Sequence, residues 1–198
     1  MERCWGALLV FLGVVGATCP GEGFPPAPPG YSGPLALVGH WVDTYSSRYI
    51  DEALFPCMGQ NVTEVNASAV LTTTTAKVVS PVIPYTYLAE FLNVVHEDAR
   101  NVFDLVPANH AARFFNGSLF FIVDFDEASN WYAWQICDPR PEGSDDYEFH
   151  VMARDPSSVD DAVSDRVLAA LAKRGLNPQN ATMHRERHPS HCAPSSGL

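Results

Sequence analysis

The residue type with the most reactive side chain is cysteine, which occurs five times, as Cys4, Cys19, Cys57, Cys137 and Cys192. No two cysteines lie close together, so none of their spacings resembles a zinc site. Cys4 falls in a leader segment, and four cysteines remain in the mature chain. An even number in an oxidising compartment predicts two disulfides, and four cysteines allow three pairings, all of which stay open at this stage.

Histidines and carboxylates are the usual acid–base and metal-binding groups, and here they form no readable catalytic pattern. The sequence shows no Ser–His–Asp arrangement and no paired carboxylates. His184, His188 and His191 gather in the C-terminal tail, but their spacing is irregular and no matching carboxylates accompany them. We therefore interpret residues 183–198 as a solvated tail and expect neither a metal site nor catalytic residues.

The first 17 residues match a secretory signal peptide. Arg3 provides the positive charge, residues 7–15 form the apolar core, and Val15-Gly16-Ala17 offers a small-residue cleavage site. The apolar run is too short to span a bilayer, and no other stretch reaches about 18 apolar residues. A lipoprotein anchor on Cys19 is a competing idea, which the preceding Thr18 disfavours. We expect a secreted, extracellular protein without stable membrane insertion.

Four Asn-x-Ser/Thr sequons support secretion, with acceptor residues Asn61, Asn66, Asn116 and Asn180. Their number in so short a chain predicts at least one N-linked glycan. The formal net charge is −11 at pH 7. An acidic surface repels phosphates, which excludes nucleic acids and anionic membranes as expected partners. A mature chain of roughly 180 residues is one domain with a substantial core.

The chain from residue 35 onward has the pattern of a β protein. Residues 18–34 are rich in Pro and Gly, which predicts an extended arm without a helix or a strand ladder. Turn signals such as Ser80-Pro81 and Asn116-Gly117 separate runs of β-branched and aromatic residues. The predicted strands are Trp41–Tyr45, Asn61–Val65, Val70–Val79, Val82–Val95, Val102–Val106, Leu119–Phe125, Trp131–Cys137 and Tyr147–Ala153.

One amphipathic helix is predicted over residues 158–174. Ser157 and Ser158 are the N-cap candidates, and Asp160 and Asp161 suit the positive first turn. The apolar stripe consists of Val159, Val163, Val167, Ala170 and Leu171. A single amphipathic helix must cover its stripe, and the outside of the sheet is the surface available for it.

Three short motifs, taken in order and spacing, resemble the lipocalin family, especially its apolipoprotein D and insect bilin-binding branch. The first is Gly39-His40-Trp41, a weak signal when alone. The second is Val123-Asp124-Phe125, where Val and Phe replace the family's usual Thr and Tyr. The third is Met152-Ala153-Arg154, just before the helix. The resemblance covers nearly the whole mature chain, although residues 67–112 show no residue-by-residue match.

The resemblance implies an all-β fold: an eight-stranded antiparallel up-and-down β-barrel with one C-terminal α-helix packed on the outside. A closed barrel has no free edges, and its interior can hold one small ligand. By resemblance, the barrel-closing motif consists of Gly39, Trp41, Asp124 and Arg154. Trp41 plugs one end, and Arg154 packs across its ring as a cation–π pair. We therefore predict that these two side chains touch.

This pairing also sets which residues face inward. If Arg154 points into the barrel, alternation places Met152, His150 and Glu148 inside, and Val151 and its odd-numbered neighbours outside. The apolar outer set fits beneath the helix stripe. With the inward positions that the resemblance implies, including Ile136, the candidate cavity residues are Tyr45, Phe120, Ile122, Tyr132, Trp134, His150 and Met152.

The same resemblance implies the disulfides Cys19–Cys137 and Cys57–Cys192. The chain then divides into a signal peptide (1–17), an arm (18–34), the barrel with its helix (35–182), and a tail (183–198) tied down by Cys192. The chain-entropy model gives about 4–5 kcal/mol for each such long loop. With every mature cysteine paired, no thiolate is left to act as a nucleophile.

The function implied is that of a secreted carrier, not an enzyme, for a small hydrophobic ligand: a tetrapyrrole, a carotenoid or retinoid, a sterol or a fatty acid. No cofactor is required, although a bound pigment such as biliverdin or a carotenoid would suit the aromatic residues. The alternatives are a protein-binding or immune-modulating role and, ranked lower, a lipocalin-type isomerase.

Overall fold

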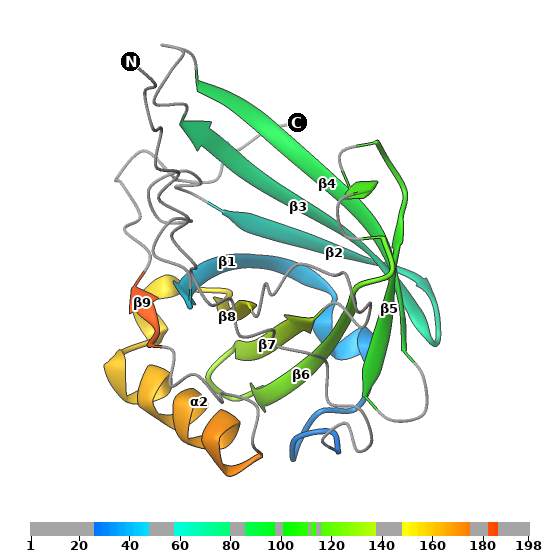
Figure 1. Ribbon diagram of the computed structural model, residues 1–198. Coiled ribbons are helices and arrows are strands. Elements are labelled where there is room, and N and C mark those ends of the chain that lie inside the picture. Colours follow the sequence, from blue (N-terminus) through cyan, green and yellow to red (C-terminus); the bar gives the residue numbers. More distant parts are fainter. Residues whose placement is uncertain are drawn as a thin grey trace, which may run out of the picture.

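Eight antiparallel strands close into a barrel, with one helix on the outside (Figure 1). The computed structural model describes residues 26–47, 58–79, 86–97, 101–110, 112–113, 116–137, 148–174 and 182–185. The strands are β1 (Gly39–Ser46), β2 (Gly59–Asn66), β3 (Ala69–Val79), β4 (Thr86–Glu97), β5 (Val102–Pro107), β6 (Leu119–Asp126), β7 (Trp131–Cys137) and β8 (Glu148–Ala153). The predicted eight-stranded barrel is thereby confirmed.

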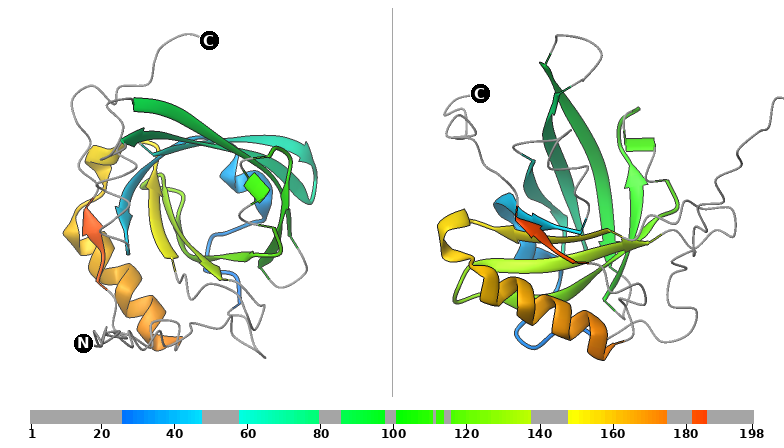
Figure 2. Two further views of the ribbon diagram at one scale, coloured as in Figure 1. Left: turned by 45° about the horizontal axis from the view of Figure 1, so that its top comes forward. Right: turned by 60° about the vertical axis from the view of Figure 1, so that its left-hand side comes forward.

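The strands pair in up-and-down order, and β1 closes the barrel. Each strand from β2 to β7 pairs with the next one along the chain, and β1 pairs with both β2 and β8. In Figure 2 the strands surround a central space and the helix lies against the outer side. Each predicted strand overlaps an observed one, with ends that differ by a few residues; residues 82–85 and Tyr147 lie outside the described residues.

Strand β1 changes partners along its length. Its first half, Gly39 to Val42, pairs with β2, and its second half pairs with β8. The register against β8 shifts between Asp43 and Tyr45, which marks a β-bulge with Thr44 as the extra residue. The bulge reverses the alternation of side chains beyond it, so Tyr45 lies on the opposite side of the sheet from Trp41 and Asp43.

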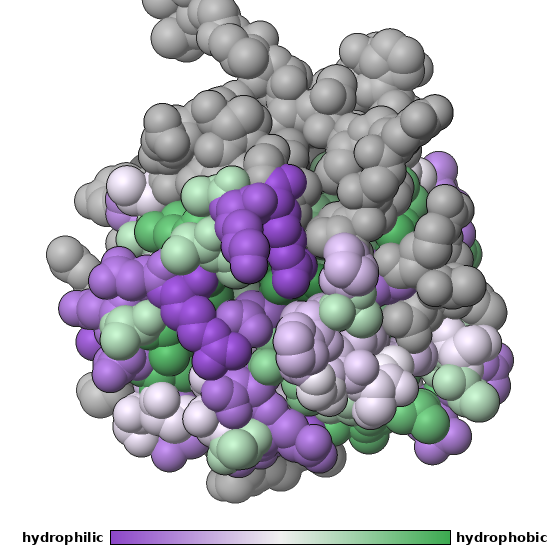
Figure 3. Space-filling view, turned by 90° about the horizontal axis from the view of Figure 1, so that it is seen from below, coloured by the Kyte–Doolittle hydropathy of each residue, from purple (hydrophilic) through white to green (hydrophobic). Residues whose placement is uncertain are grey.

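Two apolar clusters lie on the two sides of this curved sheet. The inner cluster includes Trp41, Phe120 and Met152, and the outer cluster includes Phe149, Val151 and Ala153. The alternation predicted for β8 is confirmed at its described side chains. Figure 3 shows part of the outer surface, where polar residues cover much of the view and apolar residues form separate patches.

Helix α2 (Asp161–Lys173) packs on the outer cluster. Val167 and Leu171 are fully buried there, which confirms the predicted stripe. The predicted start at residue 158 with a serine cap is wrong. Pro156–Ser158 form a short 3₁₀ helix, η3, capped by Asp155, and Asp160 caps α2 by accepting a hydrogen bond from the Val163 amide at 3.2 Å.

Two short elements depart from the prediction. The 3₁₀ helix η1 (Pro34–Leu37) begins on the last residue of the predicted arm, because proline is well suited to the first turn of a helix. In the predicted solvated tail, β9 (His184–Arg185) pairs with Tyr45 and Ser46 of β1. The edge of β1 is open there because β2 pairs only with its first half. None of the helices in the described part of the chain is long and apolar enough to cross a membrane.

Candidate functional site: a cavity inside the barrel

One end of the barrel is sealed by Trp41, whose side chain is almost fully buried. Its indole Nε1 donates a hydrogen bond to the Leu37 carbonyl of η1 at 2.6 Å. The Arg154 guanidinium carbon lies 4.1 Å from the indole centroid, and Nη2 donates to the Val38 carbonyl at 2.8 Å. The predicted contact between Trp41 and Arg154 is therefore present. The helix η1 also contacts the Trp41 indole, which the sequence does not predict.

Gly39 makes room for this arrangement. Its φ of +132° lies in a region that side-chain-bearing residues rarely adopt, and a Cβ added there would overlap Arg154 Nη1. The Arg154 side chain thus approaches the backbone closely at Gly39. A glycine at this position is required both by backbone conformation and by the space that Arg154 occupies.

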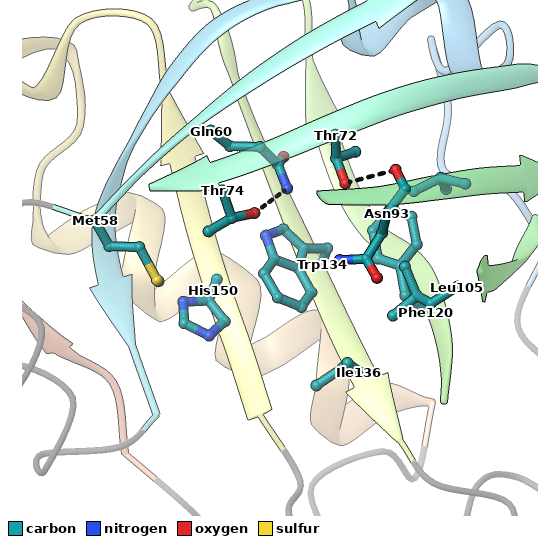
Figure 4. Close-up of a pocket in the computed structure, with 11 residues that line it drawn as sticks. Met58, Gln60, Thr72, Thr74, Asn93, Leu105, Phe120, Trp134, Ile136 and His150 are labelled. Carbon is teal, nitrogen blue, oxygen red and sulfur yellow. Dashed lines mark hydrogen bonds between the residues drawn. The ribbon is translucent and has the colours of Figure 1, made fainter. Parts of the chain in front are cut away.

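A cavity lies within the barrel, and its lining falls into two groups (Figure 4). The volume open to the centres of water molecules is about 90 Å³, several times the space that one water needs. Strands β2, β3 and β4 contribute mostly polar side chains, and β6 and β7 contribute aromatic and apolar ones. The lining residues are Met58, Gln60, Thr72, Thr74, Asn93, Val95, Leu105, Phe120, Trp134, Ile136 and His150.

A buried pair, Asp43 and His150, lies beside the cavity. His150 Nδ1 is 2.5 Å from Asp43 Oδ2, and both side chains are almost fully buried. The His150 ring stacks on the Trp134 indole, with centroids 4.5 Å apart and an interplanar angle of 16°. A buried ion pair is poor evidence for stability, because desolvating both charges offsets most of their attraction. Its place at a cavity makes it a candidate functional group.

The predicted cavity residues separate into three groups. Phe120, Trp134 and His150 line the cavity, as predicted, and so does Ile136. Ile122, Tyr132 and Met152 face inward but pack in the inner cluster with Trp41. Tyr132 packs edge-on against Trp41, with ring centroids 4.7 Å apart, and donates a hydrogen bond to Gln60 Oε1 at 2.6 Å. Complete burial raises the pKa of Tyr132.

The prediction that Tyr45 lines the cavity is wrong. Because of the bulge in β1, its ring packs in the outer cluster, and its hydroxyl donates to Asp161 Oδ1 of α2 at 2.7 Å. The Arg185 guanidinium of β9 lies 5.8 Å from the ring centroid. Burial, followed by the hydrogen bond to Asp161, raises the pKa of Tyr45 to about 12.

Asp124 contacts the helix rather than the Trp41–Arg154 pair. Its carboxylate accepts hydrogen bonds from Arg166 Nε at 2.7 Å and Nη2 at 2.9 Å, and one from the Phe125 amide. The register of β6 shifts between Ile122 and Asp124, which turns Asp124 toward α2. Arg166 also lies 4.9 Å from the centroid of the Trp131 ring. In the described residues, then, Asp124 attaches α2 to β6, which corrects its predicted place in the closing contact.

Asp43 and the polar wall are the cavity groups that the sequence prediction misses. Asp43 lies two residues after Trp41, so strand alternation alone places it inside. Asn93 interrupts an apolar run in β4, which is a readable signal of a buried polar group. The threonines of β3 offer no such signal. Residues 72–75 are all threonine, so the sequence does not show which of them face the barrel interior and which face outward.

The predicted modifications are only partly within the described residues. Cys137 is disulfide-bonded, and its partner lies outside the described residues, as do Cys19, Cys57 and Cys192, so both pairings stay predictions. Asn61, Asn66 and Asn116 are exposed, and Asn180 lies outside the described residues. Of the histidines in the tail, His184 belongs to β9, and the described residues contain no cluster of three or more metal-ligating side chains.

Comparison with known proteins identifies the fold. Lobster apocrustacyanin A1 matches with a TM-score of 0.57 and 12% identity, covering 79% of this chain and 80% of that chain. The cockroach allergen Per a 4 matches with a TM-score of 0.58 and 17% identity over 87% and 96%. Japanin from Rhipicephalus appendiculatus, solved bound to cholesterol, matches with a TM-score of 0.54 and 12% identity over 82% and 100%.

No family model and no curated protein sequence matches the chain. The structural matches are lipocalin-fold proteins, and their low sequence identity establishes the fold alone. This chain therefore has the lipocalin fold, a closed eight-stranded barrel with one helix, as its sequence motifs predict.

Proposed function

We propose that this protein is a secreted member of the lipocalin family that carries a small, predominantly hydrophobic ligand inside its barrel. The observation that supports this most strongly is the cavity between Trp134 of β7 and Thr74 of β3, together with the seal that Trp41 and Arg154 form at one end. Removing apolar ligand surface from water contributes roughly 25 cal/mol per Å², and a few polar groups orient the ligand.

A carrier needs no reacting groups, and the proposal assigns none. Asp43 and His150 form a hydrogen-bonded pair, and the cavity lining, where described, holds no Ser, Cys or Lys that such a pair could activate. The hydroxyls in that lining belong to Thr72, which donates to the Asn93 backbone carbonyl, and to Thr74, which accepts from Gln60. Japanin has been solved with cholesterol, which supports the idea that this barrel shape can enclose a small molecule. The leader, the sequons and the predicted disulfides support secretion.

Native mass spectrometry of the protein purified from its own source tests the proposal. We expect a mass excess in the wild type that an organic solvent releases. Expressed in the same source, Thr74→Phe fills the cavity and should abolish the excess, whereas Thr73→Phe, on the opposite face of the same strand, should leave it unchanged. An equal excess in both variants would place the ligand outside the barrel and contradict the proposal.

A further inference from the structure

The two walls of the cavity differ in chemistry, and this restricts the ligand. On one wall, Gln60 Nε2 donates to Thr74 Oγ1 at 3.3 Å, and Thr72 Oγ1 donates to the backbone carbonyl of Asn93 at 3.3 Å. On the other wall, the Trp134 ring meets Phe120 edge-on, with centroids 5.6 Å apart. Figure 4 shows the Trp134 indole and the His150 ring together, facing the strands that carry these polar side chains.

Two cavity-lining side chains hold buried polar atoms that have no hydrogen-bond partner in the described part of the chain. They are the indole Nε1 of Trp134, a donor, and Oδ1 of Asn93, an acceptor. Asn93 is only 5% exposed. Buried polar groups are nearly always hydrogen-bonded, and an exception in a native structure calls for a specific explanation. A ligand with a hydrogen-bonding group would satisfy these atoms.

The charges near the cavity disfavour an anionic ligand. The described lining contains no lysine or arginine, and its one histidine is hydrogen-bonded to the buried Asp43. The whole chain carries a formal net charge of −11, so a carboxylate entering the barrel meets repulsion from outside. Among the described lining residues, the His150 ring is the one group that can become positively charged, and it is already paired with the Asp43 carboxylate. This argues against a fatty acid.

We infer that the cavity selects a compact, uncharged aromatic compound with a hydrogen-bonding substituent on its ring edge. This rests on the proposed function and narrows its ligand class. The ring packs against Trp134 and Phe120, and the substituent bonds to Asn93 Oδ1, to Trp134 Nε1, or to both. The part of the cavity that the described residues line, about 90 Å³ for water centres, has room for one or two fused rings.

Isothermal titration calorimetry with three probes tests this at pH 7: 2-naphthol, naphthalene and oleate. The first two share one ring system and differ by a single hydroxyl. Satisfying a buried hydrogen-bonding group corresponds to roughly tenfold in affinity, so 2-naphthol should bind about tenfold more tightly than naphthalene. Oleate should bind more weakly than 2-naphthol.

Substitutions of Asn93 and Trp134 test whether these side chains cause the preference for 2-naphthol over naphthalene. Asn93→Leu keeps the branched shape and the number of heavy atoms, removes the acceptor, and should lower the ratio of naphthalene to 2-naphthol dissociation constants several-fold. In protein produced without N-linked glycans, Asn61→Leu, the same change on an exposed position of β2, should leave that ratio at the wild-type value. Should Asn93→Leu fail to fold, Trp134→Phe is the second variant: it keeps an aromatic ring, removes the donor, and should lower the ratio several-fold.

The outcomes separate the inference from the proposed function. Tighter binding of oleate than of 2-naphthol, or a ratio that is unchanged in both Asn93→Leu and Trp134→Phe, overturns the inference and leaves the carrier function standing. The same holds if no probe binds while the native mass excess is lost in Thr74→Phe. If no probe binds and the purified protein carries no mass excess, both the inference and the carrier function fail.

Discussion

At the scale of the residue, Gly39 and Arg154 share one small space at the closed end. We predict that Gly39→Ala lowers the free energy of unfolding by about 3 kcal/mol, through backbone strain and displacement of Arg154 from the Trp41 ring. Gly117→Ala is the matched control, because Gly117 also has a positive φ (+84°) but nothing within 4 Å of the added Cβ. It should cost about 1–2 kcal/mol, from strain alone. If chemical denaturation gives equal losses of unfolding free energy for the two variants, the position of Arg154 over Trp41 does not depend on Gly39.

Tyr45 makes stability depend on pH in the alkaline range. Its pKa is raised from 10 to about 12 in the folded protein, so the neutral phenol is favoured by folding. The contribution is fully present below pH 10 and is lost as the pH rises toward 12. We predict that Tyr45→Phe is less stable than wild type at pH 8, by about 1 kcal/mol for the lost hydrogen bond, and that this difference shrinks between pH 10 and 11.5.

Denaturant unfolding of both proteins across this pH range measures the difference. Tyr132 also has a raised pKa, but it is present in both proteins and cancels in the comparison. A difference that stays constant, or grows, with rising pH contradicts the role given to Tyr45.

Residue positions can be predicted from the sequence wherever strand alternation is unbroken. His150 and Met152 lie on the face that alternation predicts, and Trp41 contacts its predicted partner. Tyr45 does not follow the pattern, because a bulge at Thr44 reverses the alternation, and a bulge depends on how two strands pair rather than on any one residue. The same applies to Asp124, which follows the irregularity in β6.

At the scale of the element, the start of α2 depends on one carboxylate. Asp160 Oδ1 accepts from the Val163 amide, and a negative charge there also interacts favourably with the helix dipole. We predict that Asp160→Ala lowers the free energy of unfolding by about 1 kcal/mol. Ser158→Ala, a change at the cap position favoured by sequence, should stay within about 0.5 kcal/mol. A larger loss of stability in Ser158→Ala than in Asp160→Ala, measured by thermal or chemical unfolding, would show that Ser158 caps the helix.

Most elements could be predicted, since β-branched runs and turn residues define the strands and the apolar stripe defines α2. The two short elements could not. η1 is stabilised by tertiary contacts, with Leu37 in the inner cluster and its carbonyl bonded to Trp41. β9 consists of two polar residues, and its pairing depends on the edge that β1 exposes once β2 ends.

At the scale of the whole molecule, barrel closure and cavity chemistry are separate properties. Closure follows from local signals at the motifs around Trp41 and Arg154. The polar wall does not, because Gln60, Thr72 and Asn93 come from three strands whose shared face depends on the register in which those strands pair. The fold could therefore be predicted from sequence, whereas the amphipathic character of the cavity could not.

A ligand enclosed between the aromatic and polar walls of the barrel is what we propose. A crystal structure of the protein purified from its own source tests this most directly. We expect electron density for one compact molecule packed against the Trp134 ring, with a polar atom within hydrogen-bonding distance of Asn93 Oδ1 or Trp134 Nε1. A cavity that holds only water, with the co-purified molecule bound on the outside of the barrel, would contradict it.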